Sequence, residues 1–287
     1  MLQRRSLPRV AIAVCIMLGI IACGSSGVPS GSSAPQQKIP PLSGKVNVGV
    51  ATDLSGIATL DTERGIRAGF DIDLVRWLGR NTAPAGFDPT FVDTLIRDRV
   101  PALTSGRVRL VAEAFSITDE KQQSIDFAGP YLITQQGAMV RTGDQRITDV
   151  NSLVGKTVCA PAGSTSVDQL PQFLRDQIFL RQEPGVGICA RLLAEGQIDV
   201  VSTDQLVLSG FAGKNPGLRV VPGLKFGAQE RYGVGLPNGD RDTCARISDA
   251  LTDFIASGAW NQFFNENFPG LTASEYKPDP YALNTCA

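Results

Sequence analysis

The sequence ALTSGRVRLVAEAFS, from Ala102 to Ser116, has the pattern of a helix end, a glycine turn and a buried strand that runs into a polar edge. Gly106 stands where the helix is expected to end, because glycine readily adopts the left-handed conformation of helix C-termini. The sequence LLAEGQIDVVSTDQ, from Leu192 to Gln205, repeats this order. Alternating strands and helices form a mostly parallel sheet with helices on its faces. The two copies therefore predict two similar α/β lobes.

The neighbouring segments extend the same pattern. Alternating valines in KVNVGVATD predict a strand within Lys45–Asp53 that ends in a polar loop. Apolar residues at helical spacing predict a helix over Gly69–Asn81. The stretch Leu153–Leu174 is expected to form a strand, a glycine loop and a helix. Ligands of such sheets bind outside the carboxyl ends of the strands, which is where both polar edges fall.

Near the C-terminus, apolar residues from Ile247 to Ile255 form one stripe of a predicted helix. The stretch GAWNQFFNENFPG (258–270) continues it with four aromatic residues. We expect these aromatic side chains to pack in the core.

The N-terminal residues have the pattern of an export signal. A basic start precedes an apolar run, Val10–Ala22, that is too short to span a bilayer as a helix. The sequence IIAC, ending at Cys23, resembles a bacterial lipobox, in which the cysteine is lipidated; the alternative is an ordinary signal peptide with an incidental cysteine. Residues 24–44 are rich in Gly, Ser and Pro, as in a flexible tether. We predict a lipoprotein signal peptide (1–22), a lipidated tether (23–44) and a location on the extracellular face of the cell membrane.

Charge argues against a nucleic-acid partner. The full chain has 27 basic and 28 acidic residues, and removal of residues 1–22 takes away Arg4, Arg5 and Arg9. The remaining 24 basic residues give a net charge of −4, whereas basic patches supply most of the affinity for nucleic acid.

Four cysteines remain after the signal and the lipobox, and outside the cell they should be oxidised. There is no CxxC pattern, so zinc binding and redox catalysis are disfavoured and no metal is expected. Of the three possible pairings we favour Cys159–Cys189 and Cys244–Cys286, because each closes a loop within one segment of the sequence.

Several stretches, in this order, resemble the polar amino-acid family of bacterial ABC-transporter solute-binding proteins. The resemblance extends from about Lys45 to Phe268, and glutamate-binding lipoproteins of Gram-positive bacteria are the most similar members. The stretches are GFDIDLVRWLGR, ALTSGRVRLVAEAFSITDEKQQSIDFAGPYL, GSTSVDQL and EGQIDVVSTDQ.

The resemblance implies a type II periplasmic-binding-protein-like fold, with two lobes joined by two hinge strands. Lobe 1 is expected over 45–139 and 236–287, and lobe 2 over 140–235. It also implies a monomer that needs no cofactor and delivers a polar amino acid to an ABC permease. Glutamate is the ligand that we expect, with aspartate and glutamine as alternatives. The segment IDFAGPY resembles the family's edge strand and turn.

In the first lobe, the resemblance assigns the ligand's α-carboxylate to the stretch that begins at Ser116. Thr118 is expected to cap a short helix and to contact the ligand. Lys121 stands where the family has an arginine, so the charge is kept but the bidentate fork is lost. Phe115 belongs to the same predicted site. Lys121 has the alternative role of a solvated helix charge.

In the second lobe, Gly163, Ser164 and Thr165 form a glycine turn that is expected to open a helix and to offer hydroxyl and N–H groups to an anion. Asp204 aligns with the family acid that binds the ligand's α-ammonium group. Its alternative role is a helix cap.

Recognition of the ligand's side chain is expected near Arg64 and Arg67, in the loop where the family shapes this pocket. Asp53 also belongs to the predicted ligand site. One arginine would read the extra carboxylate of glutamate. Glu113 is a departure, because relatives have a small or uncharged residue there. It would share the ammonium group with Asp204, pair with an arginine or exclude acidic ligands, and the sequence leaves these three options open.

Two other functions fit the same fold. One is a cyclohexadienyl dehydratase-like enzyme, although a chain with no histidine leaves acid–base chemistry to carboxylates alone. The other is a sensor domain that presents an amino acid to a kinase. We expect a binding protein with no catalytic residues.

Overall fold

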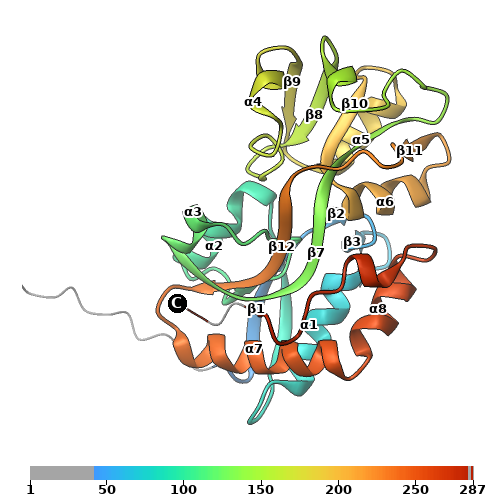
Figure 1. The fold of residues 1–287 in the computed structure, drawn as a ribbon. Coiled ribbons are helices and arrows are strands. Elements are labelled where there is room, and N and C mark those ends of the chain that lie inside the picture. Colours follow the sequence, from blue (N-terminus) through green and yellow to red (C-terminus); the bar gives the residue numbers. More distant parts are fainter. Residues whose placement is uncertain (1–41, 284–285, 287) are drawn as a thin grey trace, which may run out of the picture. The chain divides into compact units, whose positions relative to one another are not determined.

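The computed structural model describes residues 42–283 and Cys286, which belong to one compact unit (Figure 1). The predicted signal peptide, Cys23 and nearly all of the tether lie outside the described residues. The strands are β1 (Lys45–Val50), β2 (Asp53–Leu54), β3 (Ala58–Asp61), β4 (Ile66–Ala68), β5 (Asp88–Asp93), β6 (Leu110–Val111), β7 (Ile125–Arg141), β8 (Thr157–Pro161), β9 (Phe179–Glu183), β10 (Val200–Asp204), β11 (Leu218–Val220) and β12 (Phe226–Pro237). The helices are α1 (Phe70–Asn81), α2 (Arg99–Thr104), α3 (Asp119–Gln122), α4 (Gln172–Arg175), α5 (Val186–Ala194), α6 (Gln205–Lys214), α7 (Arg241–Ala256) and α8 (Ala259–Asn267), with short 3₁₀ turns η1 (Ile96–Asp98), η2 (Asn151–Leu153) and η3 (Ala273–Glu275).

Nine strands form one sheet in the order β5-β1-β6-β12-β7-β10-β8-β9, with β11 beside β7. At one end β1 is parallel to β5 and β6, and at the other β8 is parallel to β9 and β10. Each parallel group has its own helices, as the repeated sequence pattern predicts. The prediction of two similar α/β halves is confirmed.

The first half forms from residues with clear periodicity. The alternating residues Val46, Val48 and Val50 of β1 are buried. Helix α1 buries an apolar stripe and packs against α7 and α8. Leu42 is also fully buried, and Arg246 donates to its carbonyl at 3.2 Å. The folded part therefore begins before Lys45, where we expected the tether to end.

The second half departs from the prediction after β8. Residues 162–170 form turns and bends. Between β8 and β9 the one helix is the four-residue α4. The Ser164 hydroxyl donates to the Pro161 carbonyl at 2.7 Å and accepts from the Ser166 N–H at 3.2 Å. Serine side chains that bond to nearby backbone compete with helix formation. Pro171 also disfavours a continuous helix here, because the residue before a proline avoids the helical conformation.

Two long antiparallel strands, β7 and β12, join the halves (Figure 1). The N-terminal part of β7 pairs with the C-terminal part of β12, and residues Gln136–Met139 of β7 pair with β10. The segment IDFAGPY begins β7 and pairs with β12 through Ile125–Ala128, whereas β10 and β11 pair with β7 only from Gln136 onward, which agrees with the expected edge strand. Strands β7 and β12 are where we expected hinges; the lobe boundaries themselves stay a prediction.

The C-terminal helices close the core as expected. Trp260 and Phe264 of α8 are fully buried, and their rings stack with centroids 4.9 Å apart. The indole N–H of Trp260 donates to the Tyr131 carbonyl at 2.7 Å. A buried indole needs such a partner, and this bond ties α8 to β7.

Both predicted disulfides are present. Cys159 of β8 is bonded to Cys189 of α5, and Cys244 of α7 to Cys286. They close loops over sequence separations of 30 and 42 residues, one in each half.

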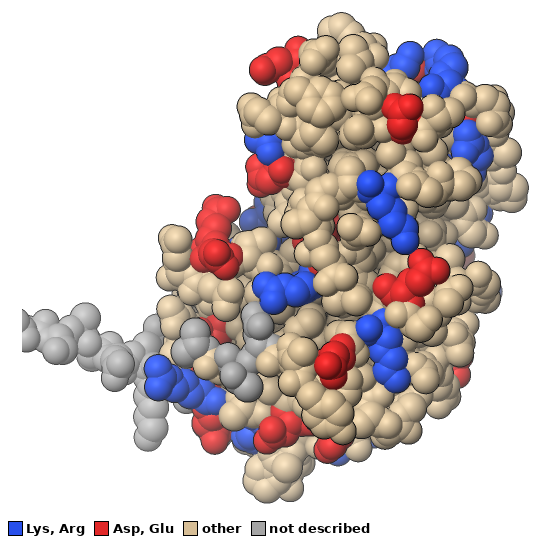
Figure 2. Space-filling view, viewed as in Figure 1, with Lys and Arg blue, Asp and Glu red and all other residues tan. Residues whose placement is uncertain are grey.

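Charged residues of both signs are interspersed over the described residues in the face that Figure 2 shows. That face carries no broad basic patch of the kind that binds nucleic acid.

Candidate functional site

A small cavity lies where the polar edges of the two halves meet. Its volume is about 20 Å³, roughly the space of one water molecule. An amino acid enters only if the walls separate. The lining residues are Leu54, Ile96, Arg99, Glu113, Ala114, Ser116, Pro161, Ser164, Thr165, Val186, Thr203, Asp204 and Val207.

The two repeated stretches supply the charged walls. Glu113 and Ser116 follow β6 in the first half, and Asp204 ends β10 in the second. Both positions are carboxyl ends of strands, as expected for a ligand site in such a sheet. The structure thus brings together five of the residues that the sequence singled out: Glu113, Ser116, Ser164, Thr165 and Asp204.

Asp204 presents an unused acceptor to the cavity. The side chain is 6% exposed, and Tyr232 donates to Oδ2 at 2.5 Å, whereas Oδ1 has no partner within the described residues. Asp204 is the N-cap residue of α6, the position of its alternative role, but its side chain makes no capping hydrogen bond. Burial, with help from Glu230, raises its pKa to about 7. An incoming cation would supply the missing partner.

Arg99 lines the cavity and was not found from the sequence. It is 5% exposed, and its guanidinium lies over the Phe115 ring, 4.6 Å from the centroid. Nε donates to the Ile96 carbonyl at 2.8 Å, and Nη1 donates to the carbonyls of Glu113 and Ala114 at 3.0 and 3.3 Å. These bonds fix the plane of the guanidinium.

One more contact of Arg99 crosses to the second half. Its Nη2 donates to the Gly163 carbonyl at 3.3 Å. Because a guanidinium carries five N–H donors, one N–H remains for a ligand. The sequence held one signal for this residue: a cation in the first turn of a helix, where the dipole favours acids.

Glu113 is held in the cavity by an unusual turn. Ala114 has φ 43°, which is uncommon for a residue with a side chain. Asp71 of α1 stabilises this turn from behind, since its Oδ2 accepts from the Ala114 N–H at 2.8 Å. The Glu113 side chain is 1% exposed, and burial raises its pKa to about 8.

Lys121 lies behind the cavity wall and is not among the lining residues. Its Nζ donates to the Ser116 carbonyl at 2.9 Å and lies 5.5 Å from the centroid of the Phe115 ring. Burial and the positive charge of Arg99 lower its pKa to about 8. Thr118 caps α3, as expected, by accepting from the Lys121 N–H at 3.3 Å. Lys121 adds positive charge near the site.

The glycine turn of the second half contributes backbone and hydroxyl groups. Gly163 has φ 77°, and a Cβ there would lie 2.6 Å from the Arg97 Cα. The hydroxyl of Ser164 is engaged locally, whereas that of Thr165 forms no hydrogen bond within the part of the chain described. Thr165 is therefore the better hydroxyl donor to a ligand.

Asp53 does not line the cavity and instead joins the halves. It begins β2, and its Oδ2 accepts from the Gly187 N–H at 3.3 Å. Gly187 lies in the first turn of α5, where free N–H groups and the helix dipole favour an anion. Asp53 thus helps to hold the closed arrangement.

Arg64 and Arg67 are not brought to the cavity. Arg64 has a side chain that is 76% exposed and lies 3.7 Å from Asp61. Arg67 pairs with Asp93 and lies over the Phe91 ring, 5.9 Å from its centroid. Both arginines pair with acids outside the cavity, and Arg99 is the arginine that lines it.

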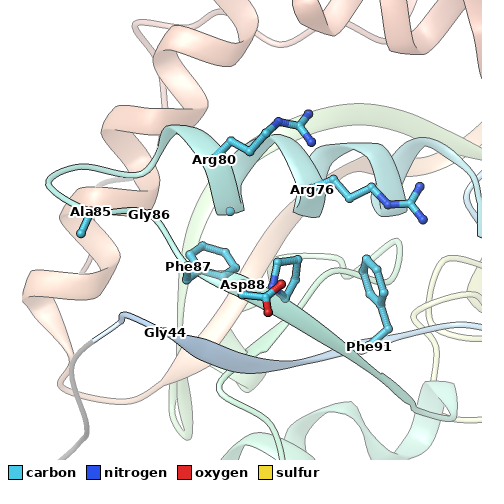
Figure 3. A pocket seen from close by; sticks show the side chains of 10 residues that line it. Gly44, Arg76, Arg80, Ala85, Gly86, Phe87, Asp88 and Phe91 are labelled. Carbon is cyan, nitrogen blue, oxygen red and sulfur yellow. The ribbon is translucent and has the colours of Figure 1, made fainter.

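A larger hollow lies elsewhere. A groove of about 620 Å³ separates Arg76 and Arg80 of α1 from the segment that carries Phe87 and Asp88 (Figure 3). It is open to solvent, and Arg76 already donates to a main-chain carbonyl at 3.2 Å. The smaller cavity, with buried groups of opposite charge, is the better binding site.

Nothing in residues 42–283 or Cys286 forms a cluster of three or more His, Cys, Asp or Glu side chains that could hold a metal ion. Within the same residues, no helix is long and apolar enough to cross a bilayer.

Two α/β halves share two long strands, and groups of opposite charge line the cavity between them. This arrangement is typical of a protein that binds a small solute. The chain belongs to the bacterial extracellular solute-binding proteins, family 3, whose profile matches residues 46–270. The predicted fold and family are therefore confirmed.

The chain is similar to several binding proteins over most of its length. The glutamate-binding protein GluB of Corynebacterium efficiens is 29% identical over 280 residues, which cover 93% of each chain. The ABC transporter glutamine-binding protein GlnH of Bacillus subtilis is 25% identical over 266 residues, covering 91% of this chain and 95% of that protein. A solved ancestral arginine-binding protein bound to arginine has a TM-score of 0.72 and 27% identity, covering 80% of this chain and 100% of that one.

Proposed function

We propose that this protein is the amino-acid-binding component of an ABC uptake transporter and that glutamate is its main ligand. The proposal is carried by one observation: Asp204, with a free Oδ1, and Arg99, with one free N–H, line the same closed cavity. An α-amino acid supplies the matching pair of an ammonium group and a carboxylate.

Charge balance favours an acidic ligand. Arg99 and Lys121 bring two positive charges to the site. Asp204, whose pKa is about 7 without a cation beside it, brings one negative charge once the ligand's ammonium group pairs with it. If Glu113 is protonated, as its raised pKa indicates near neutral pH, the site is +1 and matches the net charge of −1 on glutamate. The names of the similar proteins support an amino acid as the ligand, and the name of the glutamate-binding protein GluB supports glutamate in particular. We assign to Arg99 the ligand's α-carboxylate, a role that was expected of Lys121.

The small cavity implies that the two halves separate to admit the ligand. Motion about β7 and β12, the strands that join the halves, would accomplish this. Contacts across the closed site include those from Arg99 to Gly163 and from Gly187 to Asp53. Ligand bridging Arg99 and Asp204 would add to them and favour closure, because a ligand stabilises the state that it binds best.

We further propose that lipid on Cys23 anchors the protein to the extracellular face of the membrane and that it acts as a monomer beside its permease. The sequence of the first 44 residues supports this, and membership of an extracellular family agrees with it. Metabolic labelling with a fatty-acid analogue tests the anchor: wild-type protein should incorporate it, and the Cys23→Ala variant should not.

We propose that the protein is not an enzyme, as the transport names of its relatives support. Product formation from arogenate or prephenate would argue instead for the dehydratase alternative. A kinase gene beside this one, in place of a permease gene, would argue for the sensor alternative.

The proposed ligand is tested by a thermal-shift panel of the twenty amino acids on residues 24–287. Ligand binding stabilises the folded state by RT ln(1 + [L]/Kd), so a micromolar ligand at millimolar concentration adds about 4 kcal/mol. We expect the largest shift with glutamate. No shift with any amino acid would contradict the proposed function.

A further inference from the structure

Glu113 lines the cavity but has no hydrogen-bonding partner for its carboxyl group. The side chain is 1% exposed, and neither Oε1 nor Oε2 is hydrogen-bonded within the described residues. An ionised carboxylate is strongly disfavoured in such a place unless it is paired. A neutral acid, or a ligand that supplies the missing partner, resolves this.

Arg99, the cation of the same cavity, does not supply that partner. Its Nη1 donates to the main-chain carbonyls of Glu113 and Ala114, not to the Glu113 carboxyl group. Asp71 fixes the same turn from behind through the Ala114 N–H. The backbone is therefore held on both sides, while the side chain is left for the contents of the cavity.

The other charged groups around Glu113 are acids. Burial is the largest cause of its raised pKa, and the positive charge of Arg99 opposes it. The nearby acids, which raise this pKa further, are Asp71 of α1, Asp53 of β2 and Asp98 of η1. Asp204 of β10 lines the same cavity. This environment favours the protonated, neutral form of Glu113 at physiological pH.

We propose that Glu113 determines specificity by donating its carboxyl O–H to an oxygen of the ligand's side chain. This inference rests on the proposed amino-acid-binding function. In its neutral form Glu113 donates to the carboxylate of glutamate or to the amide oxygen of glutamine. Once ionised, it repels the carboxylate of glutamate but accepts from the amide NH₂ of glutamine. The preference between the two ligands therefore depends on pH.

The test is calorimetric titration of wild-type residues 24–287 with glutamate and with glutamine from about pH 6.5 to about pH 9.5, a range that spans the pKa of Glu113. The readout is the ratio of Kd for glutamate to Kd for glutamine. Both ligands carry an α-ammonium and an α-carboxylate, so titration of those groups largely cancels in the ratio. Titration of Lys121, whose pKa is also about 8, acts on the extra charge of glutamate and is separated by the control variant. We expect a constant ratio below about pH 8 and a rise of up to about tenfold per pH unit above it, the limit for one proton.

The matched control is Glu113→Gln, whose amide donates a hydrogen bond at every pH. We expect it to bind glutamate near neutral pH with a ratio that rises clearly less with pH than that of the wild type, because only the contribution of Lys121 remains. A flat ratio in the wild type, or an equally steep rise in the variant, would overturn the inference. If the variant does not fold, Lys121→Gln replaces it: the rise should persist in Lys121→Gln, and its loss there would overturn the inference. Absence of binding by both amino acids at every pH is a different result, which would overturn the proposed function itself.

Discussion

Tyr232 donates its hydroxyl hydrogen to Oδ2 of Asp204 at 2.5 Å and leaves Oδ1 free toward the cavity. Tyr232 lies on β12, one of the two strands that join the halves, and Asp204 ends β10. The bond fixes the orientation of a carboxylate that would otherwise rotate. It prepares one oxygen to receive a cation from the ligand.

The Tyr232→Phe substitution tests this orientation. We expect glutamate affinity to fall about tenfold, since a hydrogen bond to a charged group contributes about 1.5–3 kcal/mol. Titration calorimetry gives the value. Tyr281→Phe is the matched control, because Tyr281 is an exposed tyrosine. Equal affinity of the two variants would show that the Tyr232 bond has no role in binding.

Replacing Arg99 with glutamine should weaken glutamate binding by at least about tenfold, because a charge-assisted hydrogen bond is lost. Arg64→Gln serves as the control, since the Arg64 side chain is exposed and pairs with Asp61. The measurement is Kd for glutamate by calorimetry, with thermal unfolding to check the fold. If Arg64→Gln were the weaker binder, the assignment of the carboxylate to Arg99 would be wrong.

Closure of the two halves should depend on Gly210. Its carbonyl accepts from the Ser55 hydroxyl at 2.8 Å, and a Cβ at this position would lie 1.9 Å from the Ser55 carbonyl oxygen. Gly210→Ala is therefore expected to hold α6 away from the turn after β2 and to weaken binding.

Small-angle scattering provides the readout for this variant. With saturating glutamate, Gly210→Ala should keep a larger radius of gyration than the wild type. Gly213→Ala on the same helix is the control, because a Cβ there meets nothing within 4 Å. Identical radii for all three proteins would argue that the Ser55 contact does not limit closure.

The buried Asp71 predicts a pH dependence of stability. Burial raises its pKa from 3.8 to about 7 in the folded state. Between these values the folded protein keeps a proton that the unfolded chain has released, so the free energy of unfolding should fall as pH rises from about 4 to about 7. The slope is at most about 1.4 kcal/mol per pH unit for this group.

Urea unfolding at about pH 5 and about pH 7.5 measures this change across the pKa of Asp71. Asp71→Asn should lose less stability over this interval than the wild type, since asparagine does not titrate but can still accept from the Ala114 N–H. Asp73→Asn, on the same helix but near Arg76, is the control and should behave like the wild type. An unchanged slope in Asp71→Asn would contradict the prediction.

Much of the fold could be predicted because the sequence patterns of its strands and helices depend on residues that are close together in the chain. The alternation of Val46, Val48 and Val50 and the helical spacing over Gly69–Asn81 depend only on side chains that face one core. The helix expected after Gly163 failed for a reason that is also local. Serine side chains there bond to nearby backbone, and this competition is hard to weigh against helical spacing from sequence alone.

The site could be predicted only in part. Asp204 was found from its alignment with a family acid and Glu113 as a departure from the family, and both lie at strand ends, where ligands of such sheets bind. Arg99 was missed because its position depends on tertiary contacts with the carbonyls of Glu113 and Gly163. Arg67 was chosen from its place in the sequence, but Asp93 at the end of β5 pairs with it.

Titration calorimetry of Asp204→Asn with glutamate tests most directly whether this cavity receives the ligand's ammonium group. Asparagine keeps the shape of the side chain and can still accept from Tyr232, so the fold should persist. Loss of one partner of a buried charge pair costs about 2–5 kcal/mol, and we therefore expect affinity to fall by at least about thirtyfold. A folded Asp204→Asn variant that binds glutamate as tightly as the wild type would contradict the proposed clamp.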